Sequence, residues 1–265
     1  MVSSPASSIR FEIIGYWFRS ETSSKGVRER TGIGTTEGHG KDYLPAIGHD
    51  RLLPLYDLLY RLLGIASVHR PLVYQAGIRP GHRVLEIGCG TGNLALLAKR
   101  LHPDAEVVGL DPDPKALARA RRKAGRKARS VRLDLGFAQE LPYPDASFDQ
   151  VLSAFMFHHL GPDDKEKALR EVRRVLKPGS SLHLLDLGGA KASSDGFLAR
   201  LSYRHGRLQD NLEDRIPTLM REAGLAEATE VAHRVTKVWG RVTYYRATVP
   251  RVESSAARHG AGPRK

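Results

Sequence analysis

Residues 84–98, VLEIGCGTGNLALLA, decide how this chain folds. An apolar run of strand character leads into Gly88, Gly90 and Gly92, and a helical pattern follows at once. Glycine adopts positive φ and lets a ligand approach the backbone closely. The N-terminus of the next helix offers N–H groups to a polar or negatively charged group. The segment predicts a ligand-binding strand–turn–helix unit, and the alternative is a tight turn that binds nothing.

Strands and helices alternate around this segment. We predict strands over 83–87, 106–110, 131–135, 148–154 and 181–187, and helices over 67–76, 94–101, 114–127, 165–176 and 211–223. Such alternation is typical of βαβ units and a parallel sheet. Residues 226–235 and 238–249 both have strand composition and predict a terminal hairpin. The predicted fold class is α/β: a Rossmann-like, doubly wound, seven-stranded sheet, mostly parallel, with a C-terminal antiparallel β-hairpin.

The second predicted strand ends in an acid, Asp111, which follows Gly92 by 19 residues. A Rossmann-like fold places a ribose-binding carboxylate near this position, where one carboxylate accepts hydrogen bonds from both ribose hydroxyls. The alternative is a helix N-cap before Pro112. Because the acid occurs together with the glycine loop, the pair favours a nucleoside ligand.

The order of the glycines separates two classes of cofactor. A dinucleotide fingerprint, G-x-G-x-x-G, would have its third glycine where Asn93 stands. The loop here is G-C-G-T-G, and with Glu86 before it this loop resembles motif I of the class I S-adenosylmethionine-dependent methyltransferases. The resemblance implies that Glu86 orients the amino-acid moiety of S-adenosylmethionine and that Asp111 binds its ribose. It also implies backbone contacts from Gly88, Gly90 and Gly92.

Three more segments carry the resemblance. Residues 136–149, GFAQELPYPDASFD, resemble the stretch that reads the adenine, which implies contacts at Phe137 and Ala138. Many family members have an aspartate where Phe137 stands, so one carboxylate contact to the adenine is missing. Residues 151–160, VLSAFMFHHL, resemble the segment that ends at the active-site floor, where Ser153 is expected to bind the cofactor.

Residues 175–186, VLKPGSSLHLLD, resemble the family's strand-five motif. The resemblance covers about residues 55–249. It is strongest to the broad group that includes quinone-biosynthesis C-methyltransferases and many small-molecule methyltransferases. It implies one domain over 41–250, with an N-terminal helical lid at 41–78 and a cofactor-binding core at 79–190. Residues 1–40 and 251–265 lack periodicity and predict a weakly ordered tail and a disordered basic tail.

His158 and His159 are the candidate catalytic residues. They follow the fourth predicted strand at the carboxyl edge of the sheet, where α/β folds bind ligands. Imidazole titrates near neutral pH and suits a general base, which is needed only if the acceptor loses a proton. The alternative is that they cap a turn or face solvent. Residues 155–157 are predicted to line an apolar or aromatic acceptor pocket, or to belong to the core.

A formal net charge of +13 bears on possible partners. Residues 115–132 hold nine basic side chains and no acidic one. This basic cluster is either a solvated helix face or a site for nucleic acid or an anionic membrane.

The cysteine count and the histidine spacing bear on disulfides and metal sites. A single cysteine, Cys89, excludes an intrachain disulfide, and the histidines show no metal spacing, so we predict no metal. No stretch approaches the roughly 18 apolar residues that a membrane helix needs, so we predict no transmembrane segment and a cytoplasmic location.

The leading interpretation is a methyltransferase (EC 2.1.1.-) that acts on a small molecule. The basic cluster keeps open an RNA methyltransferase, although the N/D-P-P-[FYW] signature of some amino-methylating families is absent. A NAD-type oxidoreductase is opposed by the glycine spacing and by the lack of a Tyr-x-x-x-Lys pair. A catalytically silent cofactor-binding protein would look the same in sequence. The acceptor atom and the oligomeric state stay open.

Overall fold

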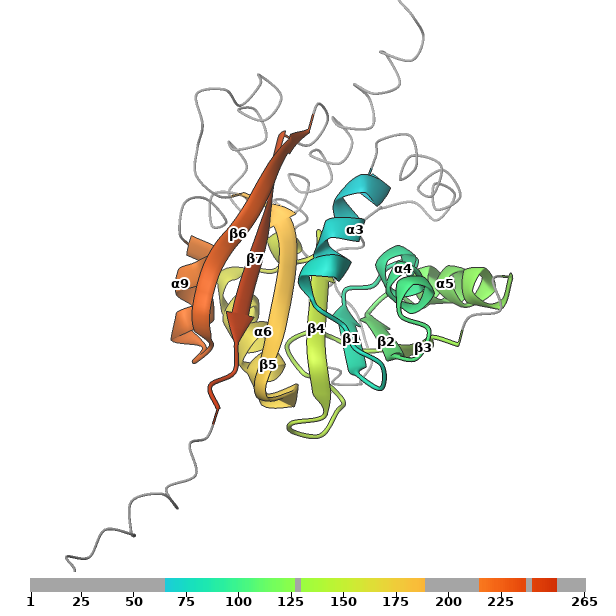
Figure 1. Ribbon diagram of the computed structural model, residues 1–265, viewed down its shortest axis with the longest axis horizontal. Coiled ribbons are helices and arrows are strands. Elements are labelled where there is room, and N and C mark those ends of the chain that lie inside the picture. The colour runs from blue at the N-terminus through green and yellow to red at the C-terminus, as the bar shows by residue number, and fades with distance from the viewer. Residues whose placement is uncertain (1–64, 127–129, 189–214, 237–239, 252–265) are drawn as a thin grey trace, which may run out of the picture.

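A seven-stranded sheet forms the centre of the structure, with strand order β3-β2-β1-β4-β5-β7-β6 (Figure 1). The computed structural model describes residues 65–126, 130–188, 215–236 and 240–251. The strands are β1 (Arg83–Ile87), β2 (Glu106–Asp111), β3 (Arg132–Leu135), β4 (Phe148–Ala154), β5 (Leu176–Leu187), β6 (Ala226–Thr236) and β7 (Gly240–Thr248). The helices are α3 (Ile65–Gln75), α4 (Asn93–Leu101), α5 (Pro114–Arg126), the 3-10 helix η2 (Phe157–His159), α6 (Pro162–Val175) and α9 (Arg215–Glu222).

The first five strands are parallel, and the last two form an antiparallel hairpin. β1 pairs with both β2 and β4, so the strand order reverses between β1 and β4. β7 pairs antiparallel with β5 and with β6, which lies at the edge of the sheet. In open α/β sheets ligands bind outside the carboxyl ends of the strands at such a reversal. The predicted fold class is confirmed.

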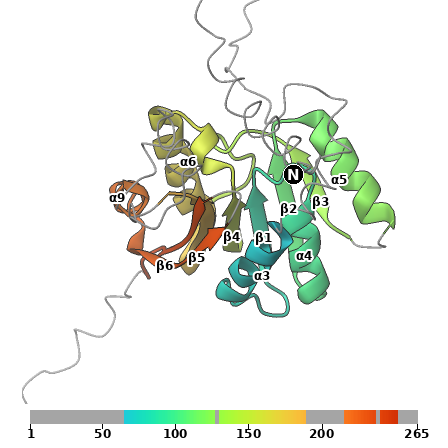
Figure 2. The ribbon, with the colours of Figure 1, turned by 90° about the horizontal axis from the view of Figure 1, so that it is seen from above.

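Helices cover both faces of the sheet (Figures 1 and 2). On one face, apolar residues of α3 and α4 such as Leu72 and Leu94 pack with Leu185 and Tyr244 of the sheet. On the other face, α6 and α9 pack onto β4, β5 and β7. Helix α5 contacts β2 and β3. These two apolar layers hold the strand ends in fixed positions.

Most element boundaries lie within a few residues of the prediction, and two differ for physical reasons. β5 begins at Leu176 and not at residue 181, because Leu176 already pairs with Phe148 before a register shift at residues 177–180. Gly179, with φ 80°, makes that irregularity possible. α6 begins at Pro162, because proline suits the first helical turn and Gly161 serves as N-cap.

Several predictions fall outside the described residues. They are the helix of the lid up to residue 64, the two tails, and the first four residues of the helix predicted over 211–223.

His183 connects α3 to the buried middle of the sheet. Its Nδ1 accepts a hydrogen bond from the Gln75 amide at 3.1 Å, and its Nε2 donates to Gln150 Oε1 at 3.2 Å. The same Gln75 amide donates to the Tyr245 carbonyl at 3.0 Å. This arrangement suits a neutral ring, and burial lowers the pKa of His183 to about 3.

We expect the protein to lose stability as the pH falls below about 6.5. There the unfolded imidazole gains a proton, whereas the folded His183 ring stays neutral until its pKa of about 3. Each pH unit in that window costs up to about 1.4 kcal/mol. His183→Gln has no imidazole to titrate, so its deficit against the wild type should shrink by roughly 2 kcal/mol between pH 6.5 and pH 5. Urea unfolding at both pH values measures this deficit, and an unchanged deficit contradicts the prediction.

Candidate functional site

The glycine loop joins β1 to α4 in a conformation that needs glycine. Gly88, Gly90 and Gly92 have φ of 68°, 50° and 75°. Residues other than glycine rarely adopt this positive-φ region of backbone conformation. The Gly90 N–H donates to Asp111 Oδ2 at 2.7 Å, so the loop is tied to the end of β2.

The three glycines differ in their surroundings. A Cβ at Gly88 would lie 2.2 Å from Met156 Cγ, and one at Gly92 would lie 3.0 Å from Ala120 Cβ. A Cβ at Gly90 would meet no heavy atom within 4 Å in the described part of the chain. Gly88 and Gly92 therefore allow close packing inside the protein, whereas Gly90 leaves room for a ligand to approach.

Asp111 is 7% exposed at the carboxyl end of β2. Besides Gly90, it accepts the Asp113 N–H at 2.9 Å. Burial raises its pKa to about 6, although both backbone hydrogen bonds oppose this rise. Asp113, and not Asp111, caps helix α5, since its Oδ1 accepts the Lys115 N–H at 2.8 Å. The structure thus favours the ligand-binding interpretation of Asp111 over the N-cap interpretation.

Glu86 is buried within β1 next to the loop. Burial raises the pKa of Glu86 well above its ordinary value. The hydrogen bond from the Ala95 N–H in the first turn of α4 opposes this rise, and the negative charge of Asp111 adds to it. Its Oε2 has no hydrogen-bond partner among the described residues. A buried carboxylate with one oxygen that accepts no hydrogen bond could bind a cationic group of a ligand. Such a group would stabilise the ionised form of the carboxylate.

Lys123 reaches from α5 to the glycine loop. Its Nζ donates to Thr91 Oγ1 at 2.9 Å and to Asn93 Oδ1 at 2.7 Å. Two other members of the basic cluster also make contacts within the protein: Arg121 donates to the Leu133 carbonyl at 2.8 Å, and Arg132 pairs with Asp134 at 2.9 Å. Part of the basic cluster therefore has a structural role.

The β3–β4 loop begins beside Asp111. The Gly136 N–H donates to the Asp111 carbonyl at 3.2 Å. Phe137, half-buried, forms a bridge with Glu140, and Ala138 is buried. Both predicted adenine contacts thus lie in a loop that starts at the predicted ribose carboxylate.

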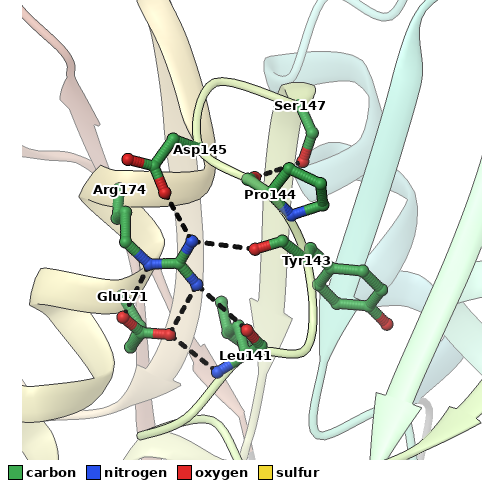
Figure 3. A network of polar contacts seen from close by, with 7 residues as sticks. All are labelled: Leu141, Tyr143, Pro144, Asp145, Ser147, Glu171 and Arg174. Atoms are coloured by element: carbon green, nitrogen blue, oxygen red, sulfur yellow. Dashed lines mark hydrogen bonds and ion pairs between the residues drawn. The ribbon is translucent and has the colours of Figure 1, made fainter.

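Arg174 of α6 holds the second half of that loop (Figure 3). Its guanidinium contacts both carboxylate oxygens of Glu171 at 2.8 Å and Asp145 at 2.7 Å. It also donates to the carbonyls of Leu141 and Tyr143, while Glu171 accepts the Leu141 N–H at 2.7 Å. Arg174 lowers the pKa of Glu171, so the network carries an ionised carboxylate at neutral pH.

The chain turns sharply after β4. Phe155 has a φ of 55°, which is strained for a bulky residue, and its N–H donates to the Leu185 carbonyl at 2.9 Å. The turn brings Met156 against Gly88 and leads into η2. Strain of this kind concentrates at functional sites.

His158 and Asp186 form a buried pair at the carboxyl ends of β4 and β5. His158 Nδ1 lies 2.5 Å from Asp186 Oδ1, and the side chains are 3% and 0% exposed. The His158 backbone N–H also donates to Asp186 Oδ2 at 3.0 Å. A buried carboxylate on an imidazole fixes which ring nitrogen carries the proton.

The other two predicted site residues lie close by. His159 is half-buried, and its ring lies 4.2 Å from that of His158. Ser153 is fully buried near the end of β4, and its hydroxyl has no hydrogen-bond partner in the described ranges. The roles of both residues stay predictions.

The described residues contain neither a cluster of metal ligands nor a helix suited to span a membrane. Within the described ranges, no group of three or more His, Cys, Asp or Glu side chains is placed to hold a metal ion. None of the helices that the structure describes combines the length and apolar character needed to cross a membrane.

Comparison with known proteins identifies the family. Residues 84–179 match the family described as Methyltransferase domain. The demethylmenaquinone methyltransferase of Thermus thermophilus is 40% identical over 156 residues, which are 58% of this chain and 70% of that protein. This chain belongs to the class I S-adenosylmethionine-dependent methyltransferases. The family assignment explains why a glycine loop and an acid at the end of β2 occur together.

Other relatives match over a smaller share of their length. The demethylmenaquinone methyltransferase of Deinococcus radiodurans is 40% identical over 157 residues, covering 58% of this chain and 64% of the relative. The chloroplastic 2-phytyl-1,4-beta-naphthoquinone methyltransferase of Arabidopsis thaliana is 34% identical over 158 residues, covering 56% of this chain and 59% of the relative. The chain thus spans less than two thirds of both proteins.

Solved structures agree on the fold of this chain. The YcgJ protein of Bacillus subtilis superposes with a TM-score of 0.57 at 20% identity, over 71% of this chain and all of that one. The [4+2]-cyclase SpnF superposes with a TM-score of 0.58 at 18% identity, over 77% of this chain and 96% of that one. Since one of them is named a cyclase, the fold alone does not specify the reaction.

Sequence reasoning missed Lys123 and Asp186 as site residues. Lys123 was part of a basic cluster, and only the packing of α5 brings it to the loop. Asp186 had a usable signal, because it is the acid at the carboxyl end of β5. Arg174 was also missed. No sequence signal pointed to it, since its partners are mostly backbone carbonyls and carboxylates of a distant loop.

We expect Lys123→Met to loosen the glycine loop. The variant keeps the apolar stem and loses two charge-assisted hydrogen bonds, so the free energy of unfolding should fall by about 1–3 kcal/mol. Affinity for S-adenosylhomocysteine should fall roughly tenfold, because the loop must then be ordered on binding. Urea unfolding and calorimetric titration measure the two effects.

The matched control is Arg122→Met. Arg122 lies on the exposed face of the same helix. This change should alter neither measurement. Equal behaviour of the two variants would show that the contacts of Lys123 do not support the loop.

Proposed function

We propose that this protein transfers a methyl group from S-adenosylmethionine to a hydroxylated aromatic small molecule of the quinone type. The observation that carries the proposal is the convergence of Gly90, Asp111 and Glu86 at one edge of the sheet. Asp111 holds the Gly90 N–H at 2.7 Å, and Glu86 keeps one buried oxygen without a partner among the described residues. The site thus has features that suit both ends of a nucleoside that carries a cationic amino acid.

Each residue of the site would have a separate task toward the cofactor. Asp111 would accept hydrogen bonds from the ribose, Glu86 would face the amino group, and Phe137 and Ala138 would flank the adenine. When bound, S-adenosylmethionine supplies an electrophilic methyl group: the acceptor's electron pair forms the new bond to carbon while the S–CH3 bond breaks and leaves its electrons on sulfur. Much of the acceleration would come from positioning the reactants and excluding water.

The acceptor class is supported by the relatives and by chemistry. The Thermus and Deinococcus relatives are named for demethylmenaquinone, and the plant relative for a phytyl naphthoquinone. An acceptor for an electrophilic methyl group must be electron-rich, so we propose the reduced, dihydroxy form of such a ring. Half-buried Met156 lies next to the glycine loop, half-buried Phe155 precedes it, and both side chains suit an apolar ring.

His158 is our choice over His159 for the proton acceptor of the reaction. Its ring is fixed by Asp186 at 2.5 Å, whereas His159 is half-buried beside it. The nucleic-acid partner and the cytoplasmic location stay predictions from the sequence.

The ionisation of Asp111 gives a first test. With a pKa raised to about 6 in the free protein, Asp111 is ionised at pH 7.5 and mostly protonated at pH 5. Only the carboxylate accepts hydrogen bonds from two ribose hydroxyls. Affinity for methylthioadenosine should therefore fall roughly tenfold from pH 7.5 to pH 5. This ligand lacks the amino-acid group, so Glu86 does not contribute.

Asp111→Asn is the control for this measurement. It should bind weakly at both pH values, without the change between them. A wild-type affinity that is the same at pH 7.5 and pH 5 counts against a ribose contact by Asp111.

Turnover gives the second test. The wild type should convert 1,4-dihydroxynaphthalene, kept reduced, and S-adenosylmethionine into a product heavier by one methyl group, as measured by mass spectrometry. Gly90→Ala should lose at least roughly tenfold in cofactor affinity, because its new methyl group stands where the ligand approaches.

Gly77→Ala is matched to Gly90→Ala. Gly77 also has a positive φ, 54°, and also has no heavy atom within 4 Å of a built Cβ in the described part of the chain. Both variants should therefore carry a similar backbone strain of about 1–2 kcal/mol. Affinity lost equally in both would mean that strain, and not a ligand, explains Gly90.

A further inference from the structure

We infer that Asp186 is a positioning residue that sets the tautomer of His158, and that the pair directs the enzyme to acceptors that carry an ionisable hydroxyl group. The inference rests on the proposed function for the identity of the reaction. It adds a residue to which the sequence analysis gave no role, and it gives a physical reason for the hydroxyl group of the proposed acceptor.

The geometry of Asp186 leaves little freedom to either side chain. Its Oδ1 lies 2.5 Å from His158 Nδ1 and accepts the Leu187 N–H at 2.7 Å, while its Oδ2 accepts the His158 N–H at 3.0 Å. The carboxylate thus receives two backbone donors besides the ring. It lies at the end of β5, which is held between β4 and β7. Such anchoring fixes both the position and the orientation of the imidazole.

The chemistry of the carboxylate decides the tautomer. An ionised carboxylate only accepts hydrogen bonds, so the facing Nδ1 must carry a hydrogen. In the neutral ring the basic lone pair is then on Nε2. Asp186 therefore presents His158 as a base at a defined atom.

Titratable groups close to the pair come from η2 and β7. The His159 ring lies 4.2 Å from the His158 ring between centroids, with the two planes tilted by 38°. Tyr245 of β7 interacts electrostatically with Asp186. It also interacts with Arg241 of the same strand and with Glu230 of β6. Arg241 pairs with Glu230 at 2.7 Å, so these two charges largely compensate each other.

Met156 connects the pair to the cofactor loop. It lies two residues before His158, and its Cγ would be 2.2 Å from a Cβ at Gly88. The strained turn at Phe155 sets this arrangement. A base at His158 is thus built onto the same edge of the sheet as Gly90 and Asp111.

The proposed step is a single proton transfer. The acceptor's O–H bond breaks, its electron pair stays on the acceptor, and the proton binds to His158 Nε2. The resulting imidazolium is stabilised by Asp186 and later releases the proton to water. The step makes the acceptor more nucleophilic, and it needs no oxidant or reductant. It offers nothing to an acceptor that is already an anion.

Nitrogen-15 NMR tests the tautomer without turnover. In wild-type protein labelled at histidine, the His158 signals, assigned by their loss in His158→Gln, should show a protonated Nδ1 and an unprotonated Nε2. In Asp186→Asn the amide can donate to Nδ1, so the signal should shift toward the opposite tautomer. A wild-type ring that carries its proton on Nε2 overturns the inference.

Kinetics test the choice of acceptor. His158→Gln and Asp186→Asn should each lower kcat for 1,4-dihydroxynaphthalene about 100-fold or more, with affinity for S-adenosylhomocysteine within about threefold. The loss of kcat in these two variants should become smaller along a series of dihydroxynaphthalenes with increasingly acidic hydroxyls, because such acceptors depend less on a base. An equal loss for every acceptor would indicate a merely structural role and overturn the inference.

Asp149→Asn and His82→Gln are the matched controls. Asp149 also accepts a backbone N–H, that of Arg83 at 2.8 Å, and forms an ion pair with Lys177 at 2.7 Å. It lies at the amino end of β4, away from the proposed site. His82 precedes β1 at the same distant edge. Both should keep kcat even if stability falls. If the wild type methylates none of the acceptors, the proposed function fails, while the NMR result still decides the role of Asp186.

Discussion

The hydrogen bond between the Gly90 N–H and the Asp111 carboxylate is the interaction on which the functional edge depends. It joins the loop after β1 to the end of β2, and the backbone carbonyl of the same aspartate anchors the loop after β3 at Gly136. One residue thus fixes the relative positions of two loops and the end of β2. Holding a carboxylate there costs desolvation energy, which is visible in its raised pKa of about 6.

Contacts from distant parts of the chain then make the edge rigid. Lys123 secures the glycine loop from α5, Arg174 secures the β3–β4 loop from α6, and Met156 packs between the glycine loop and η2. Each contact comes from an element that is itself packed on the sheet. Sites supported in this way are preorganised, so binding a ligand requires little ordering of the protein.

The sequence predicted what is encoded locally. Apolar periodicity, glycines with positive φ and an acid at a strand end are short-range signals, and they located β1, the glycine loop and Asp111 correctly. The partners of these residues are not local: Lys123 lies 32 residues from Thr91, and His158 lies 28 residues from Asp186. Phe155 also breaks the rule that positive φ belongs to glycine, so no propensity indicates its turn.

The only cysteine of the chain sits in the middle of the glycine loop. Cys89 is buried, and burial raises the pKa of its thiol well above the ordinary value. Thiol reagents attack the thiolate, so the folded protein should react with them slowly. A cysteine introduced on the surface can therefore carry a fluorophore or spin label almost alone, without removal of the native thiol. Slow modification of Cys89 itself then reports how often the cofactor end of the domain opens.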